Sequence, residues 1–141
     1  MPKKMKVVIT KGRKKMAMAR ARVKKGLSSI KINGKSLDVI EPKLARLVIE
    51  EPLIIAKELL GEKVLDSLDI DVNVSGGGVM GQAYAVRTAI GKALVQWTGS
   101  EDLKKKYLEY DRTLIIDDVR VKEPKKYLRK GARAKPTKSY R

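Results

Sequence analysis

The 141-residue sequence contains no cysteine, histidine or phenylalanine, and it has a single tryptophan. Without cysteine the chain can form neither a disulfide nor a thiolate nucleophile, and without histidine it lacks the commonest general base. The usual zinc ligands are missing for the same reason. Most familiar enzyme mechanisms therefore have no candidate residues, and we expect no catalytic residue, no metal, no cofactor and no small-molecule substrate.

Long apolar runs are also missing. No stretch approaches the length of a membrane span, and the basic N-terminus is not followed by the apolar region and cleavage site of a secretory signal. Binding to a membrane surface would need a basic amphipathic helix with Trp, Phe or Leu on its other face, and neither end of the chain has one. We therefore expect a cytoplasmic protein with no membrane partner.

Acidic residues are few, since 33 Lys and Arg stand against 16 Asp and Glu, for a net charge of +17. The charge is unevenly placed: residues 1–26 carry +11, residues 27–119 carry −3 and residues 120–141 carry +9. Solubility needs only a modest net charge, and a cationic arm repels itself unless a polyanion neutralises it. The pattern indicates one ordinary domain with two ends that bind a polyanion.

Alternation of apolar and polar residues predicts the strands. Residues 6–10 predict a short strand followed by a basic turn at residues 11–15. Residues 17–24 alternate small apolar residues with Met, Arg and Lys, which predicts a strand with a row of cations on one face. Turn signals at residues 26–29 and at Asn33–Gly34 favour a β-meander over the first forty residues. Residues 68–75 predict a further half-buried strand.

The helices are predicted from apolar periodicity and its breakers. Pro42 favours a helix start, Pro52 is expected to interrupt that helix, and a second helix from Pro52 is expected to end at Gly61. A long helix is predicted for residues 80–98, and a short one, capped by Ser100, through Tyr110. Residues 114–116 could add a last strand. These elements predict an α/β fold, an α+β two-layer sandwich with a mixed four-stranded sheet and helices on one face.

Beyond Val121 no periodicity is left. Prolines, a glycine and closely spaced cations with almost nothing to bury predict a segment that is disordered unless a partner orders it. We therefore divide the chain into an α/β RNA-binding domain at residues 1–121, which includes the basic N-terminal segment, and an extended basic tail at residues 122–141.

Two motifs suggest an enzyme at first sight. Gly76, Gly78 and Gly81 have the spacing of a dinucleotide-binding loop, but that loop needs a second parallel strand directly after its helix, and here another helix follows. The glycines are better interpreted as allowing close backbone approach beside a helix N-terminus that could accept an RNA phosphate. Asp117–Asp118 with Glu123 suggest a magnesium site. However, adjacent residues on a strand point to opposite faces, so we expect these acids to pair with nearby cations instead.

Three sequence blocks carry a family resemblance. The first, KGRKKMAMARARVKKG, contains Gly12, Arg13, Lys14, Ala17, Ala19 and Arg20. The second, GGGVMGQAYAVRTAIGKAL, contains Gly76–Gly78, Gly81, Gln82, Ala83, Arg87, Ala89 and Ile90. The third, DDVRVKEPKKYLRKGARAKPTKSYR, contains Arg120, Glu123, Lys125, Lys126, Lys130, Ala132, Arg133 and Arg141. Together they cover nearly the whole chain, and they resemble the family of small-subunit ribosomal protein nine.

The resemblance implies a fold like the second domain of ribosomal protein five, with a left-handed βαβ crossover. It also implies a place in the head of the small subunit among neighbouring head proteins. A tail that reaches the peptidyl-tRNA site would contact the tRNA anticodon arm through Lys138, Ser139, Tyr140 and Arg141. The ending Ser-Tyr-Arg differs from the bacterial Ser-Lys-Arg and resembles archaeal and eukaryotic members.

The predicted partners are therefore small-subunit ribosomal RNA (rRNA) and peptidyl-site tRNA. Cations at short irregular spacing can follow a folded RNA backbone, and phosphate contacts position a protein without reading bases. Tyr127 and Tyr140 could stack on exposed bases, and stacking against the domain is an equal alternative for Tyr127. A magnesium- or nucleotide-dependent enzyme and a protein that packages duplex DNA are the alternatives. The predicted rRNA-binding residues are Lys11, Arg13, Lys14, Lys15, Arg20, Arg22, Lys24, Arg87, Arg120, Lys125, Lys126, Arg129, Lys130, Arg133 and Lys135.

Overall fold

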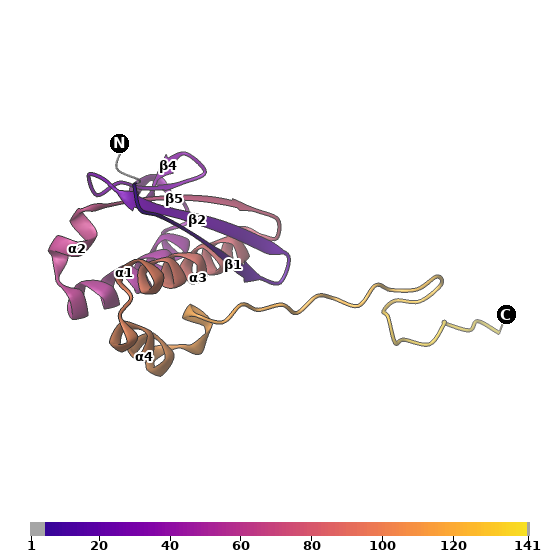
Figure 1. Ribbon diagram of the computed structural model, residues 1–141. Coiled ribbons are helices and arrows are strands. Elements are labelled where there is room, and N and C mark those ends of the chain that lie inside the picture. The colour runs from indigo at the N-terminus through magenta and orange to yellow at the C-terminus, as the bar shows by residue number, and fades with distance from the viewer. Residues whose placement is uncertain (1–4, 141) are drawn as a thin grey trace.

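The computed structural model describes residues 5–140 and has a mixed sheet with helices on one face (Figure 1). The strands are β1 (Val7–Lys14), β2 (Ala17–Lys25), β3 (Ile30–Ile32), β4 (Lys35–Ser36) and β5 (Leu68–Ser75). The helices are α1 (Lys43–Leu60), α2 (Glu62–Asp66), α3 (Val79–Thr98) and α4 (Glu101–Tyr110), with 3₁₀ turns at Leu37–Val39 and Arg112–Leu114. The predicted two-layer α/β sandwich is confirmed, although the sheet has five strands because the two-residue β4 adds an edge.

The strand order is β1-β2-β5-β3-β4, so the predicted β-meander is wrong. β2 pairs antiparallel with both β1 and β5, each along eight residue pairs, whereas β3 is only three residues long. The pairing of β2 with β5 is therefore much longer than any pairing of β3, and β5 lies between β2 and β3. β3 and β5 are parallel neighbours connected through α1 and α2, which makes a βαβ crossover.

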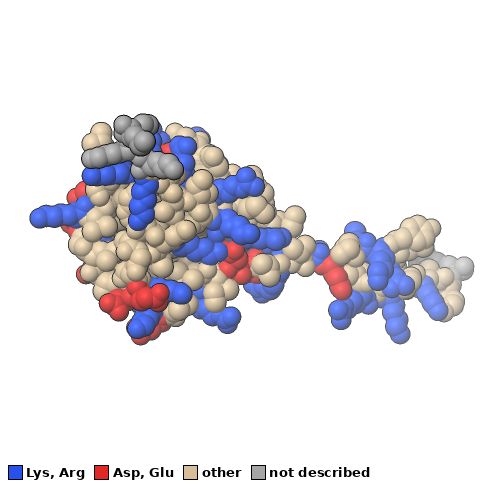
Figure 2. Space-filling model, viewed as in Figure 1, with Lys and Arg blue, Asp and Glu red and all other residues tan. Residues whose placement is uncertain are grey.

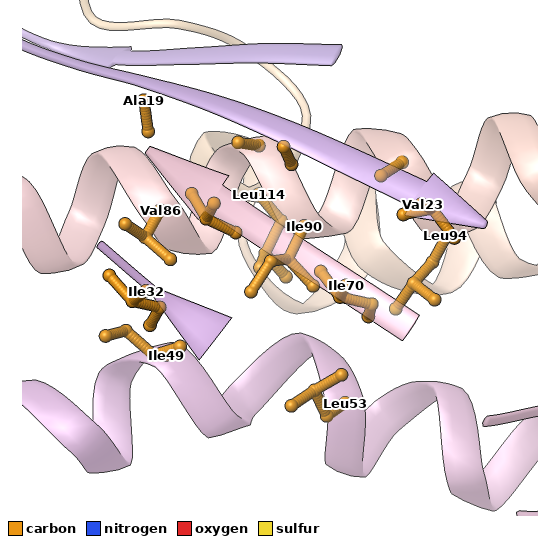
Figure 3. Close-up of a cluster of buried hydrophobic side chains, with 14 of the residues drawn as sticks. Ala19, Val23, Ile32, Ile49, Leu53, Ile70, Val86, Ile90, Leu94 and Leu114 are labelled. Atoms are coloured by element: carbon orange, nitrogen blue, oxygen red, sulfur yellow. The ribbon is translucent and has the colours of Figure 1, made fainter. Parts of the chain in front are cut away.

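The core lies between the sheet and helices α1 and α3 (Figure 3). Alternate residues from Ala17 to Val23 of β2 and from Leu68 to Val72 of β5 point toward the helices and are buried, and Val74 is half-buried, so the period-two prediction for both strands is confirmed. On α3 the predicted apolar face is buried apart from Trp97, which is half-buried. The principal buried side chains are Ala17, Ala19, Ala21, Val23, Ile49, Leu53, Leu68, Ile70, Val72, Val86, Ile90, Leu94 and Leu114.

The predicted basic turn at residues 11–15 is wrong, because β1 continues to Lys14 and only Lys15 and Met16 form the turn. Gly12 explains the continuation. It faces α3, and a Cβ atom there would lie 2.2 Å from the carbonyl oxygen of Ala85. Glycine thus lets the strand lie directly on the helix backbone, and the cations beside it on the chain project to the other face.

The predicted break at Pro52 is also wrong, since α1 is one helix across that residue. An internal proline costs a helix about 3 kcal/mol because it removes one backbone hydrogen bond. Apolar residues on both sides of Pro52 are buried in the core, and the Tyr107 hydroxyl donates a hydrogen bond of 2.7 Å to the Pro52 carbonyl. Burial along the whole helix therefore outweighs the missing bond.

The C-terminal elements follow the prediction in part. α4 begins as predicted, because the Ser100 hydroxyl accepts a hydrogen bond of 3.3 Å from the Leu103 backbone N–H. Residues 114–116 form no strand: Leu114 ends a 3₁₀ turn with its side chain fully buried. Two residues further on, Asp118 forms an isolated parallel bridge with Lys14, and within residues 5–140 this is the one sheet-like contact of the chain after α4. Residues 119–140 contain neither helix nor strand.

Candidate nucleic-acid interface

The face of the sheet that points away from the helices carries five of the predicted RNA-binding residues. β1 and β2 place them there because cross-strand partners share a face, and Lys11 lies directly opposite Arg20. Like charges in such positions repel each other, so this arrangement favours an anion lying across the strands. We call this surface the cationic face; it consists of Lys11, Arg13, Arg20, Arg22 and Lys24.

Acidic residues neutralise only part of the cationic face. Arg22 is paired with Asp71 of β5, with 2.9 Å between Nη2 and Oδ2. Asp69, which lies opposite Lys24, accepts hydrogen bonds from the backbone N–H groups of the β2–β3 turn. Within residues 5–140, no carboxylate lies within ion-pair distance of Lys11, Arg20 or Lys24. These three charges remain available to a ligand.

Apolar side chains are interleaved with the cations. Val7, Ile9 and Met18 lie on the same face and are 48%, 68% and 41% exposed. A surface that alternates cations with apolar side chains can contact both the phosphates and the sugar or base surfaces of a nucleic acid. The β3 residue Lys31 also lies on this face, where it is the register partner of Asp71. Lys31 is not among the predicted RNA-binding residues, although the alternation Ile30-Lys31-Ile32 contained the signal.

The tail begins beside the β1–β2 turn, at one end of the sheet. The Asp118 N–H donates to the Arg13 carbonyl at 3.0 Å, and the Lys15 N–H donates to the Asp118 carbonyl at 2.9 Å. The two basic ends, about a hundred residues apart in sequence, therefore meet at the β1–β2 turn. Figure 2 shows Lys and Arg side chains near this end of the domain, with acidic side chains among them, and again along the tail.

Asp117 and Asp118 pair with cations, as predicted. The Asp117 Oδ1 atom lies 2.6 Å from Lys92 Nζ, and the Asp118 carboxylate receives Lys14 at 3.3 Å and Arg120 at 2.8 Å. The hydrogen bond from Arg120, together with that from Lys14, holds the pKa of Asp118 well below its ordinary value of 3.8. Asp118 is therefore a carboxylate at all physiological pH values. Residues 5–140 contain no group of three acidic side chains placed to hold a metal ion.

The tail side chains are almost all exposed. Tyr127 and Tyr140 are 87% and 90% exposed, as stacking on a base would require. Arg133 pairs with Glu123 at 3.1 Å, but both side chains are more than half exposed, so this ion pair is worth little and a phosphate could replace it. Lys122, which is not among the predicted RNA-binding residues, is exposed as well. The remaining predicted tail cations (Lys125, Lys126, Arg129, Lys130, Lys135 and Lys138) and Ser139 are exposed as well; Arg141 lies outside the described residues.

Two of the predicted rRNA-binding residues, Arg87 and Lys14, do not lie on the cationic face. Arg87 is only 3% exposed, and its guanidinium pairs with Glu51 at 2.6 Å and Asp111 at 2.9 Å. The contact between Arg87 and Glu51 is an ion pair without the geometry of a hydrogen bond. Lys14 is turned toward the helices, where its ammonium lies 5.2 Å from the centre of the Tyr84 ring. The structure therefore brings neither side chain to the cationic face.

The glycine run serves close backbone approach, as predicted. Gly76 and Gly77 have φ values of 77° and 66°, in the left-handed region that favours glycine. A Cβ atom on Gly76 would lie 2.6 Å from the Met16 carbonyl oxygen. The run therefore lets the chain pass the β1–β2 turn before α3 begins at Val79, and this close approach explains Gly76 and Gly77 without a nucleotide.

Comparison with known proteins extends these findings. The sequence profile described as ribosomal protein S9/S16 matches residues 12–141. The chain is 53% identical over 137 residues to the small ribosomal subunit protein uS9 of Methanothrix thermoacetophila, covering 97% of this chain and 100% of the relative. It is 48% identical over 139 residues to the uS9 of Methanococcus maripaludis, with the same coverage of each chain. In the described part of the chain, no helix is long and apolar enough to cross a membrane.

Proposed function

This chain belongs to the ribosomal protein S9/S16 family, and we propose that it binds small-subunit rRNA through the cationic face and the tail. Membership confirms the resemblance drawn from the three sequence blocks. As a member, the chain is a structural component of the small ribosomal subunit, located on cytoplasmic ribosomes, and not an enzyme.

The arrangement of unpaired cations carries the rRNA proposal. Alternate residues of a strand are about 7 Å apart, so β1 and β2 present two adjacent rows of charge on one face of the sheet. Lys11 and Arg20 face each other across these rows and have no acidic partner among residues 5–140. RNA phosphates would relieve this repulsion and release their own counterions, which is the main source of affinity in such interfaces.

The salt dependence of binding tests this proposal. Replacing Lys11 and Arg20 together by glutamine is expected to lower the slope of log affinity against log salt by about 1.4 to 1.8, since each lost phosphate contact removes about 0.7 to 0.9. The affinity of the full chain for small-subunit rRNA would be measured from 50 mM to 400 mM KCl.

The matched control replaces Lys63 and Lys105 by glutamine in the same way. These two exposed lysines lie on α2 and α4, outside the cationic face. It removes the same charge and should leave the slope nearly unchanged. Equal slopes for the two double variants would exclude the cationic face as the rRNA site. Equal affinity for duplex DNA and rRNA would favour the packaging alternative.

We further propose that the end of the tail contacts the anticodon arm of peptidyl-site tRNA through Lys138, Ser139, Tyr140 and Arg141. The family resemblance supports this, together with the exposure of Tyr140 and the absence of regular structure in residues 119–140. A chain end that carries cations and an aromatic ring can combine phosphate contacts with stacking. Neighbouring head proteins are the expected protein partners of the domain.

Deleting residues 138–141 is therefore expected to weaken retention of peptidyl-site tRNA about tenfold while subunits still assemble, because one stacked base is worth about 1–3 kcal/mol. Retention would be measured by filter binding of tRNA to reconstituted small subunits. A Tyr140→Phe chain keeps the ring and serves as the matched control, which should retain tRNA nearly as the parent does. Parental retention after the deletion would refute the tRNA contact.

A further inference from the structure

The chain between α4 and the tail is fastened to α3. The Thr88 hydroxyl donates to the Thr113 carbonyl at 2.8 Å, and the Leu114 side chain is fully buried. The Leu114 carbonyl oxygen lies so close to Gly91 that a Cβ atom there would be 2.7 Å away. This segment therefore reaches the β1–β2 turn as part of the rigid domain.

Asp118 is the last point of this attachment. Its backbone bonds to both neighbours of Lys14, donating to the Arg13 carbonyl and accepting from the Lys15 N–H. Its carboxylate, whose side chain is only 12% exposed, receives the ammonium of Lys14 from the domain and the guanidinium of Arg120 from the chain that leaves it. One side chain thus joins the end of β1 to the start of the free segment.

Beyond Arg120 the attachment ends. Among residues 5–140, every hydrogen bond and ion pair of residues 121–140 lies within the tail itself, namely Arg133 with Glu123 and Arg129 with Lys126. Val119 and Val121 are 67% and 58% exposed. Figure 1 shows the chain leaving the domain at this point and extending away from it. The boundary between fixed and free chain therefore lies at residues 118–120.

Electrostatics require a negative charge at this boundary. The β1–β2 turn carries Arg13, Lys14 and Lys15, and the segment that leaves it, residues 120–141, carries a net +9. Without Asp117 and Asp118, these like charges would repel the start of the tail from the turn. Two backbone hydrogen bonds at an exposed sheet edge would have to hold it alone, and each is worth only about 1 kcal/mol.

We propose that Asp118 is a positioning residue that fixes where, and in which direction, the basic tail leaves the domain. This rests on the proposed function of the tail, whose end must find one target in the subunit. A flexible chain of about 20 residues has an r.m.s. end-to-end distance of about 25 Å. A fixed exit raises the effective concentration of its end at a target that lies along that direction.

Distances between two spin labels test this on the full chain. Because the sequence has no cysteine, two cysteines introduced at Gln96 on α3 and at Val121 would be the only labelling sites. The chain that carries only these two labelled cysteines, called the parent below, should give a narrow distance distribution by pulsed dipolar spectroscopy. The Asp118→Asn substitution should broaden it about twofold, since it leaves the backbone groups in place but removes the charge that holds Lys14 and Arg120.

Glu123→Gln is the matched control, because it changes the net charge equally but removes a carboxylate that pairs only within the tail. It should leave the distribution unchanged. A Lys14→Gln/Arg120→Gln chain keeps Asp118 and removes its partners, so it should broaden the distribution as well, and circular dichroism would verify that each variant is folded. A distribution in Asp118→Asn as narrow as in the parent would overturn the proposal.

The distance measurement involves no tRNA, so it tests the positioning role of Asp118 separately from the tRNA contact of residues 138–141. If Asp118→Asn broadens the distribution but deleting residues 138–141 leaves tRNA retention unchanged, the positioning role stands and the tRNA contact falls. If the deletion weakens retention and Asp118→Asn changes neither the distribution nor retention, the tRNA contact stands and the positioning role falls. When both hold, Asp118→Asn subunits should retain tRNA less well than Glu123→Gln subunits.

Discussion

Replacing Arg87 by methionine is expected to lower the free energy of unfolding by about 3 kcal/mol. The Arg87 side chain is 4% exposed and faces the carboxylates of Glu51 on α1 and Asp111 after α4. Its Nη1 atom also donates to the Thr113 hydroxyl at 3.1 Å. Methionine keeps most of the apolar stem but leaves both carboxylates without their cation, and removing one partner of a buried ion pair costs about 3–5 kcal/mol. Glu51 and Asp111 are 32% and 37% exposed, so water offsets part of this cost.

Urea unfolding of the full chain would measure the change. Arg112→Met is the matched control, since Arg112 is exposed in the 3₁₀ turn that contains Thr113 and its loss removes the same charge. Exposed substitutions of this kind change stability by about 0.5 kcal/mol or less. Equal losses for the two variants would mean that the Arg87 ion pairs contribute nothing to the fold.

The pH dependence of stability gives an independent measure of the ion pair between Arg87 and Asp111. Burial raises the pKa of Asp111, but hydrogen bonds from Thr113 and Arg87 outweigh it, so the pKa lies below its ordinary value of 3.8. A carboxyl with a lowered folded-state pKa stabilises the fold above its unfolded-state pKa, and this stability is lost as pH falls through the folded-state value. Acidification below about pH 4 should therefore destabilise the parent more than Arg87→Met, in which one pKa-lowering partner is missing.

The β2 part of the cationic face could be predicted from the sequence because it depends on local geometry alone. Side chains of a strand alternate between two faces, so the pattern of Ala19, Arg20, Ala21 and Arg22 fixes which side of the sheet carries the charge. The pairing of β1 with β2 adds Lys11 opposite Arg20, and a short hairpin determines that pairing. The sequence nevertheless placed Lys11 in a turn, because the continuation of β1 through Gly12 depends on the contact of that glycine with α3.

Arg87 shows where sequence reasoning fails. Nothing in its neighbourhood distinguishes an arginine that binds a phosphate from one that is buried, because its partners Glu51 and Asp111 lie on other elements, 36 and 24 residues away. The prediction of a helix break at Pro52 was wrong for the same reason. The buried contacts that stabilise α1 on both sides of Pro52, and the hydrogen bond from the Tyr107 hydroxyl, belong to the tertiary structure. The order of β3 and β5 in the sheet likewise depends on which long strands pair, and not on which are adjacent in sequence.

Removing residues 122–141 is expected to lower the slope of log affinity against log salt for small-subunit rRNA by about 4 to 5. The estimate assigns about 0.7 to 0.9 to each of six predicted phosphate contacts. Arg133 is included because its exposed ion pair with Glu123 can be exchanged for a phosphate at little cost. The six residues are Lys125, Lys126, Arg129, Lys130, Arg133 and Lys135.

The lower slope should reflect lost phosphate contacts and not a less stable domain. In the described chain no hydrogen bond or ion pair joins residues 122–140 to the domain, so the free energy of unfolding of the shortened chain should match that of the parent. The attachment at Asp118 and Arg120 is retained. Deleting only residues 138–141 is the matched control: if those residues contact tRNA, the rRNA slope should hardly change. A parental slope after removal of the whole tail would mean that the cationic face alone carries the rRNA affinity, and that the tail cations have another partner.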